Sequence, residues 1–216
     1  MFLIKKLNKF KNNIAIVDEN NKKYSYKKIK QEINTFSKII NKKRRLCFIL
    51  CQNDISTIIA YLSFLSSGSV VALIDKNIKN NSLQNLINIY EPDYIFGLNE
   101  KCKFIFKNYK NINSTKKYVL SRIKTKKTKS KFHKDLCLLI STSGTTGSPK
   151  FVKLSYSNLE SNTTSITKFL NIKSNDITIT TLPLSYVYGL SVLNTHLYSG
   201  GKIILNNSSV IQPDFW

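Results

Sequence analysis

A run of small, hydroxylated and glycine residues that ends on a lysine occupies positions 141–150. It follows the apolar segment 136–140 and precedes the alternating segment 151–154, so we expect a loop between two strands. Glycines let backbone N–H groups approach a ligand closely, Ser and Thr hydroxyls add short donors, and Lys150 supplies a mobile positive charge. These properties suit the capture of a polyphosphate. A flexible surface loop stays open as the alternative.

The spacing within this loop differs from that of the common nucleotide-binding loop of P-loop NTPases. That loop has four residues between its first glycine and an adjacent Gly-Lys-Ser/Thr, and a helix follows it. Here two residues separate Gly144 from Gly147, and Ser148 and Pro149 come before Lys150. The segment that follows has the pattern of a strand. An ordinary P-loop NTPase is therefore disfavoured.

The loop closely resembles the phosphate loop of the adenylate-forming enzymes, which include acyl-CoA synthetases, aryl-CoA ligases, adenylation domains and luciferases. Residues 142–150 match that family's pattern Thr-Ser-Gly-Thr-Thr-Gly-x-Pro-Lys throughout. The resemblance implies that ATP is the ligand and that Lys150 is catalytic, because it would hold charge on the departing pyrophosphate. The cofactor-binding residues implied in this way are Thr142, Ser143, Gly144, Thr145, Thr146, Gly147 and Lys150.

A second segment, Pro-Leu-Ser-Tyr-Val-Tyr-Gly-Leu at 183–190, is similar to the family's Pro-Leu-Phe-His-x-x-Gly-Leu, which borders the acyl pocket. Tyr186 stands where the family often has His, and the resemblance implies that Tyr186 and Gly189 bind the substrate. An aromatic side chain would give a flat wall with a hydroxyl to orient the ligand. A core tyrosine that packs the start of a helix is the alternative. Phe151 and Tyr156 replace a usual Gly and a frequent His, which leaves the substrate subclass open.

The resemblance implies a reaction in which a carboxylic acid attacks ATP to form acyl-AMP and pyrophosphate. The acyl group then passes to a thiol of coenzyme A or of a carrier protein. Magnesium is implied by the family, but the segment that supplies its carboxylate ligand has no counterpart here. We expect residues 1–216 to be the N-terminal part of an AMP-binding large domain, truncated before the rest of that domain and the small C-terminal domain.

The isolated chain is therefore expected to be inactive, with a separate chain that carries the missing part as a candidate partner. A catalytically incompetent relic or a nucleotide-binding module of the same fold is the alternative.

The formal charge of +22 on 216 residues would suit nucleic acid or an anionic membrane as a partner. Lysine is spread along the whole chain with Asn and Ile, however, as compositional bias would produce, and no nucleic-acid-binding signature accompanies it. We expect no nucleic-acid partner. A basic nucleic-acid-binding protein remains a third hypothesis, and it would bind with strong salt dependence.

Four cysteines without a Cys-x-x-Cys pair, and only two histidines, indicate buried thiols in a reducing compartment rather than a metal site. The expected location is therefore the cytoplasm. His133 and His196 match no catalytic position, and we interpret them as surface or packed residues.

Periodicity along the chain predicts an α/β protein made of stacked β-α-β units, as in the incomplete N-terminal large domain that the resemblance implies. Uncharged residues 55–74 are long enough for a membrane span, but Ser66–Ser69 interrupts them, so we expect a helix, a tight turn and a buried strand instead. The predicted elements before the phosphate loop are a hairpin at 14–17 and 23–25, helices at 25–40, 54–65 and around 83–90, and strands at 46–50, 70–74, 94–96, 104–106 and 118–120.

After the phosphate loop the pattern predicts a helix, a strand at 177–179, a second helix through 190–197 and a strand from 202. Ser157 and Glu160 fit a capping box that would start the first of these helices. Ile166, Phe169 and Leu170 are expected to form its apolar side.

Overall fold

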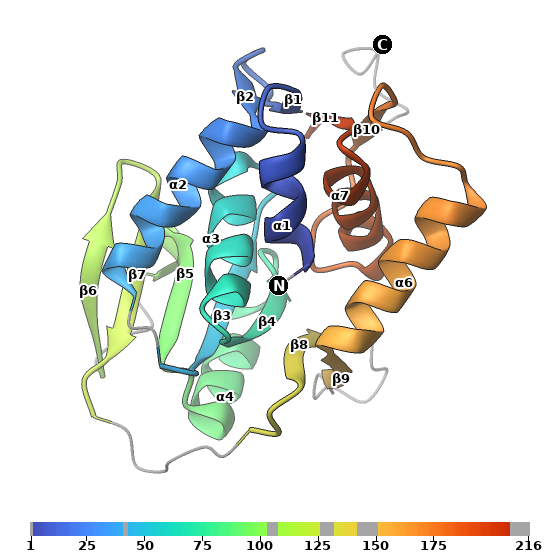
Figure 1. The fold of residues 1–216 in the computed structure, drawn as a ribbon. Coiled ribbons are helices and arrows are strands. Elements are labelled where there is room, and N and C mark those ends of the chain that lie inside the picture. Colours follow the sequence, from blue (N-terminus) through green and yellow to red (C-terminus); the bar gives the residue numbers. More distant parts are fainter. Residues whose placement is uncertain (1, 41–42, 103–107, 126–131, 142–150, 208–216) are drawn as a thin grey trace.

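The computed structural model describes residues 2–40, 43–102, 108–125, 132–141 and 151–207, which form two sheets with helices packed around them (Figure 1). The predicted α/β class is confirmed. The helices are α1 (Phe2–Lys9), α2 (Tyr26–Ile39), α3 (Ile55–Ser66), α4 (Asn80–Tyr90), α5 (Asn99–Cys102), α6 (Tyr156–Phe169) and α7 (Val187–Ser199). The strands are β1 (Ile14–Val17), β2 (Lys23–Ser25), β3 (Leu46–Cys51), β4 (Val70–Asp75), β5 (Tyr94–Leu98), β6 (Tyr109–Ser114), β7 (Tyr118–Ile123), β8 (Leu136–Ser141), β9 (Phe151–Ser155), β10 (Ile177–Thr180) and β11 (Lys202–Leu205).

The four-stranded sheet joins the two ends of the described chain. Its order is β10-β11-β1-β2. The predicted hairpin is present, since β1 and β2 pair antiparallel, and β11 pairs parallel with β1 so that Ile16 lies beside Ile203. Ile16 and Ile203 are fully buried. A strand near the start of the sequence therefore depends on one near residue 203 for its partner.

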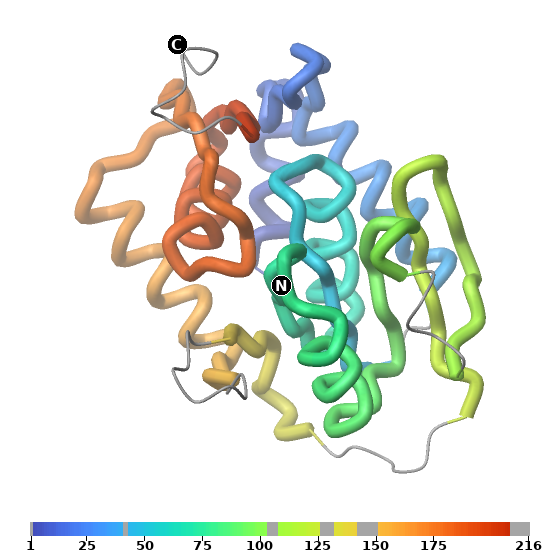
Figure 2. Tube along the Cα trace, turned by 180° about the vertical axis from the view of Figure 1, so that it is seen from behind, coloured from blue at the N-terminus to red at the C-terminus, as the bar shows by residue number. Residues whose placement is uncertain are grey.

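The seven-stranded sheet has the order β6-β7-β5-β3-β4-β8-β9, and β3, β4, β5 and β8 run parallel. This confirms the β-α-β unit expected from the two apolar strands. The side chains of β3 alternate between two cores: Cys47 and Cys51 face one core with α2 and α3, whereas Phe48 faces the other core with α4. Figure 2 shows α4 from behind, on the face away from α2 and α3. Cover on both faces explains the unbroken apolar run of β3.

The uncharged stretch at 55–74 is a helix, a turn and a strand, as predicted. Asp54 caps α3 by accepting a hydrogen bond from the Thr57 N–H at 2.9 Å, and Gly68 takes a φ of +78° in the turn before β4. Among the described residues, no helix combines the length and apolar character needed to cross a membrane.

The start of α6 differs from the prediction. The capping residues are Ser155 and Asn158, because the Ser155 Oγ accepts from the Asn158 N–H at 3.1 Å and the Asn158 Oδ1 accepts from the Ser155 N–H at 2.9 Å. The predicted box at Ser157 and Glu160 is wrong, since the helix begins directly where β9 ends.

The predicted apolar side of α6 is also wrong in part. Leu159 and Thr163 are its buried residues, whereas Phe169 is 87% exposed and Leu170 is 60% exposed. The earlier helix start places Leu159 and Thr163, four residues apart, on the packed face, and Phe169 is the last helical residue. The predicted strand at 104–106 lies outside the described residues, and β6 was not predicted.

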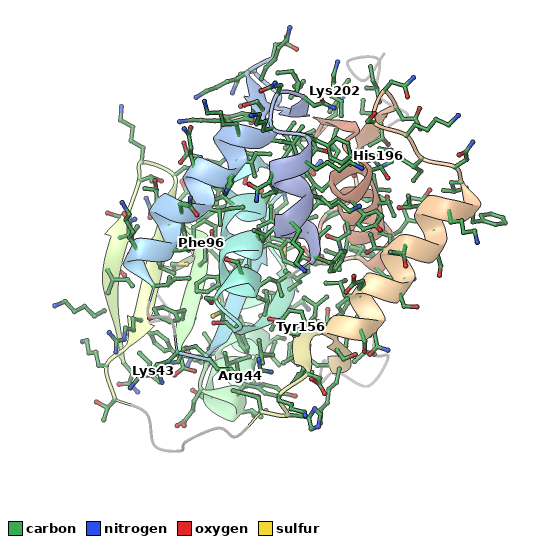
Figure 3. All side chains as sticks on the ribbon, viewed as in Figure 1. Lys43, Arg44, Phe96, Tyr156, His196 and Lys202 are labelled. Carbon is green, nitrogen blue, oxygen red and sulfur yellow. The ribbon has the colours of Figure 1, made fainter. Side chains whose placement is uncertain are left out.

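Arg44 joins the amino ends of three parallel strands (Figure 3). Its guanidinium donates to the carbonyl oxygens of Gly68 at 2.6 Å and His133 at 2.7 Å, and also to that of Leu136. Gly68 lies just before β4, and Leu136 begins β8. Arg44 thus ties together the starts of β3, β4 and β8 at the amino edge of this sheet.

Candidate functional site

The carboxyl ends of parallel strands from both sheets meet at Asn53. This buried residue lies two positions after β3, and its Nδ2 donates to the carbonyl oxygens of Thr180 at 2.7 Å and Asn206 at 2.9 Å. Thr180 ends β10 and Asn206 directly follows β11. In open α/β sheets, ligands bind in the crevice outside the carboxyl ends of the strands. Asn53 therefore marks the candidate functional edge of the molecule.

Sequence reasoning missed Asn53. The available signal was the polar run Gln52-Asn53-Asp54 directly after an apolar strand. Gln52 also takes part at this edge, because its Oε1 accepts a hydrogen bond from the Lys76 Nζ at 3.2 Å, just beyond the end of β4. A polar residue after a buried strand is a common feature, so the sequence alone did not distinguish these two.

The ends of the predicted phosphate loop lie at the same edge. Ser141 is the last residue of β8 and pairs antiparallel with Phe151, the first residue of β9. Because β8 runs parallel to β4, Ser141 lies at the carboxyl edge of the sheet. The prediction that this loop connects two strands is confirmed. The predicted loop residues Thr142, Ser143, Gly144, Thr145, Thr146, Gly147 and Lys150 lie outside the described residues.

Tyr186 lies at the start of α7 and is exposed. It is the N-cap residue, its side chain makes no capping hydrogen bond, and it is 57% exposed. Leu184 and Ser185 just before it are buried, and Val187 and Tyr188 after it are exposed. Tyr186 is therefore not a buried core residue, which was the alternative interpretation. The exposed ring is open to a ligand, although its role in substrate binding stays a prediction.

Gly189 allows the chain to turn sharply into α7. A Cβ atom at this position would lie 2.6 Å from the carbonyl oxygens of both Leu182 and Pro183. Only glycine fits that approach without a shift of the backbone. The predicted contact of Gly189 with a substrate stays a prediction, but its role in placing Tyr186 follows from this geometry.

The two predicted segments leave the same edge of the molecule. One follows β8, and the other follows β10, whose last residue is bonded to Asn53 at the end of β3. The strands β8, β4 and β3 are neighbours, so β8 and β3 lie about 10 Å apart at the usual strand spacing. A nucleotide-sized ligand would span that distance.

No histidine or cysteine is poised for catalysis in the described part of the chain. His133 is exposed and His196 is half-buried, with its Nδ1 2.9 Å from the carbonyl oxygen of Val192, which confirms their interpretation as surface and packed residues. All four cysteines are free and buried. Burial raises the pKa of both Cys102 and Cys137 to about 12, so neither thiol ionises near neutral pH.

The described residues do not fit a magnesium ion. They contain no group of three or more His, Cys, Asp or Glu side chains that could hold a metal. Magnesium prefers octahedral coordination with carboxylates and phosphate oxygens. We therefore assign no catalytic step to a metal held by these residues.

Candidate ligand segments along the carboxyl edge of parallel strands are an arrangement typical of nucleotide-binding α/β proteins. Residues 3–216 match the family model described as AMP-binding enzyme. The chain belongs to the AMP-binding enzyme family.

Solved structures share the fold of nearly the whole chain at low sequence identity. ATP-bound MatB from Rhodopseudomonas palustris has a TM-score of 0.73 and 18% identity, over 99% of this chain and 46% of that chain. O-succinylbenzoate coenzyme A synthetase (MenE) from Bacillus subtilis in complex with AMP has a TM-score of 0.79 and 17% identity, over 97% of this chain and 56% of that chain. These matches confirm that this chain has the predicted fold, which is that of the N-terminal region of adenylate-forming enzymes.

Two curated proteins are also similar in sequence. The long-chain-fatty-acid–CoA ligase 5 of Mus musculus is 40% identical over 73 residues, which are 32% of this chain and 11% of that protein. The hybrid PKS-NRPS synthetase LUC5 of a Fusarium species is 24% identical over 201 residues, which are 90% of this chain and 5% of that protein. The chain thus spans a small part of these curated relatives and about half of the solved ones.

Proposed function

We propose that this chain is the N-terminal portion of an AMP-forming ligase that activates a carboxylic acid with ATP. The acyl-AMP formed would pass its acyl group to the thiol of coenzyme A or of a carrier protein. The observation that carries the proposal is the shared carboxyl edge of β8, β4 and β3, from which both predicted ligand-binding segments depart. Family membership supports the same conclusion.

In the proposed reaction the loop at 142–150 binds the phosphates of ATP. Backbone N–H groups at Gly144 and Gly147, hydroxyl groups between them and the Lys150 ammonium would hold the charge that builds on pyrophosphate. Loss of one such preorganised donor costs about 3 kcal/mol at a transition state. Tyr186, exposed at the start of α7, would form one wall for the acid. Magnesium would have to be held by residues beyond those described.

We propose that a separate chain supplies the rest of the large domain and the small C-terminal domain and so completes the ligase. Without that chain, the 216 residues would not catalyse the reaction. We also propose a reducing compartment such as the cytoplasm, because the four free thiols are buried.

The experiment compares Lys150→Ala with Lys153→Ala, a matched change at an exposed lysine of β9. In the completed enzyme, Lys150→Ala should slow ATP–pyrophosphate exchange by about 100-fold, as expected for about 3 kcal/mol, whereas Lys153→Ala should leave it unchanged. Unchanged exchange in Lys150→Ala would refute the role of the loop. Formation of acyl-hydroxamate by the 216 residues alone would refute their dependence on a missing part.

A further inference from the structure

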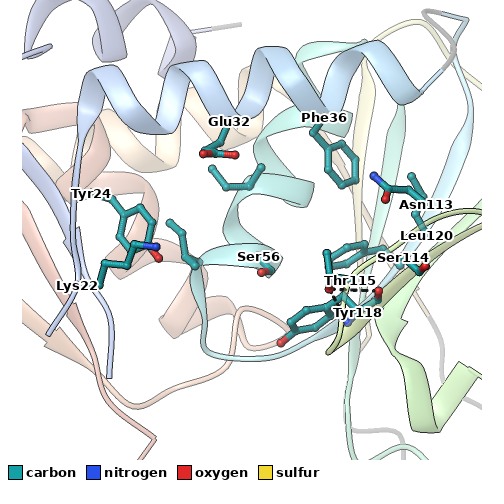
Figure 4. Close-up of a pocket in the computed structure, with 13 residues that line it drawn as sticks. Lys22, Tyr24, Glu32, Phe36, Ser56, Asn113, Ser114, Thr115, Tyr118 and Leu120 are labelled. Carbon is teal, nitrogen blue, oxygen red and sulfur yellow. Dashed lines mark hydrogen bonds between the residues drawn. The ribbon is translucent and has the colours of Figure 1, made fainter. Parts of the chain in front are cut away.

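A cavity lies between α2, the start of α3, the hairpin β1–β2 and the strands β5, β6 and β7 (Figure 4). Its volume is about 290 Å³, close to the lower bound for small-molecule sites. Within the seven-stranded sheet, β3 and β4 separate β5 from β8, which is about 14 Å at the usual strand spacing. Its lining includes neither Ser141 and Phe151, which flank the phosphate loop, nor any residue of the segment at 183–190, although Ile55 and Ser56 follow Asn53 closely in the chain.

The inner wall of the cavity is aromatic. The rings of Phe96 and Tyr118 stack with centroids 5.2 Å apart and an interplanar angle of 7°, and the ring of Phe36 meets Phe96 edge-on at 5.9 Å. Ile55 and Ile59 complete the apolar lining. Aromatic rings favour offset stacking and edge-to-face contacts with another ring. Phe96 and Tyr118 are nearly buried, so the partly exposed ring of Phe36 offers the main contact for a flat aromatic group.

The rim of the cavity carries one positive and one negative side chain. Lys22 and Glu32 are the charged residues of the lining, in a chain with 34 basic and 12 acidic residues. Figure 4 shows the carboxylate of Glu32 below α2 and Lys22 on another side of the opening, beside Tyr24. This local balance of charge favours a zwitterion over an anion.

Both charged groups are available to a ligand. Within the described part of the chain, the Lys22 Nζ has no salt-bridge partner and lies 5.2 Å from the centre of the Tyr24 ring. Glu32 pairs with Lys28 at 2.8 Å, but both side chains are at least 40% exposed. Exposed pairs of this kind contribute little and exchange readily.

The wall that carries Tyr118 is rigid before any ligand arrives. The Tyr118 hydroxyl donates to the carboxylate of Asp54, which also lies 3.5 Å from the Lys117 Nζ. The Thr115 Oγ1 accepts from the Tyr118 N–H at 2.9 Å in the turn between β6 and β7. Because these contacts fix the ring in place, a ligand would lose little free energy in ordering it.

We propose that this cavity binds an aromatic α-amino acid. Its ring would lie against Phe36 and Phe96, its carboxylate would contact Lys22, and its ammonium would contact Glu32. Serine hydroxyls at Ser56 and Ser114 on the lining add further polar groups. The proposal is independent of the ligase activity proposed above.

The experiment measures the binding of three probes to the 216-residue chain by calorimetry: L-phenylalanine, 3-phenylpropanoate and 2-phenylethylamine. The two analogues each lack one charge and should bind about two- to fivefold more weakly than the amino acid, because a contact with an exposed charged side chain contributes modestly. Lys22→Gln should weaken the amino acid and the acid but leave the amine unchanged. Glu32→Gln should weaken the amino acid and the amine but leave the acid unchanged.

Matched controls are Lys168→Gln and Glu160→Gln, two exposed positions on α6 that should leave all affinities unchanged. Circular dichroism of each variant tests whether the fold is retained. Equal binding of the three probes, absence of L-phenylalanine binding, or equally tight binding of L-leucine would each overturn the proposal. An unchanged affinity for L-phenylalanine in both Lys22→Gln and Glu32→Gln would overturn it as well.

Discussion

His196 gives the folded state a dependence on pH. Burial is the largest cause that lowers the pKa of its imidazole below the ordinary value of 6.5. The unfolded chain therefore binds a proton more readily than the folded chain below that pH. The contribution of neutral His196 to stability is fully present above about pH 6.5 and is lost as the pH falls further.

We expect the free energy of unfolding to fall between pH 7.5 and pH 5.5, by less than the about 1.4 kcal/mol per pH unit that one proton allows. His196→Gln should reduce this pH dependence. Urea denaturation at both pH values measures the difference. An identical pH dependence in His196→Gln and the unmodified chain would contradict the assignment.

Asn53 and Arg44 were harder to predict from the sequence than the segment at 142–150 that connects β8 and β9. The order of residues at 142–150 was informative because several glycines, hydroxyls and a lysine had to coincide. Asn53 and Arg44 gave no such signal, since each acts through backbone carbonyl groups far away in the chain, such as Thr180 and Leu136. The sequence around a residue does not contain that information.

At the scale of elements, a substitution in the turn into α7 tests how tightly the backbone packs there. Gly189→Ala would place a Cβ atom 2.6 Å from two carbonyl oxygens, so the turn or the helix must shift. We expect a loss of about 1–3 kcal/mol in the free energy of unfolding, the usual cost of overpacking. Ser191→Ala, two residues further along the same helix, is the control and should change stability by less than about 0.5 kcal/mol. Chemical denaturation would show equal stabilities if the turn were loose.

Strands with unbroken apolar runs were predicted well, because burial on both faces leaves a strong pattern in β3 and β4. The start of α6 was not predicted correctly, because Ser155 and Ser157 are both plausible N-cap residues. The position at which β9 ends determines which of the two caps the helix. The strand β6 was missed because its residues are mostly polar and exposed. Pairing with β7, rather than its own pattern, makes it a strand.

At the scale of the whole molecule, exposed apolar side chains gather in one part of the sequence. Among the described residues, eight of the ten exposed large hydrophobic side chains lie between 169 and 188: Phe169, Leu170, Ile177, Ile179, Leu182, Tyr186, Val187 and Tyr188. Such clustering differs from the single exposed apolar residues that most proteins carry.

The predicted absence of a nucleic-acid partner, despite the charge of +22, stays a prediction.

We expect this part of the chain to bind a hydrophobic fluorescent dye in the folded state. The double change Phe169→Lys with Ile177→Lys should reduce the fluorescence, because it replaces two of the exposed side chains. Ile89→Lys is the control, since Ile89 is 71% exposed but lies on α4, outside the cluster. Equal fluorescence from the double variant and the control would show that the dye binds elsewhere.

The pairing of β1 with β11 bears on how the chain is made. Ile16 leaves the ribosome before its partner Ile203, which is added 187 residues later. At about 5–20 residues per second, the hairpin waits roughly 10–40 s with one edge open. During that time a chaperone or a neighbouring nascent chain has access to it. Slower translation would therefore lower the yield of native protein more for this fold than for one whose first strand pairs only locally.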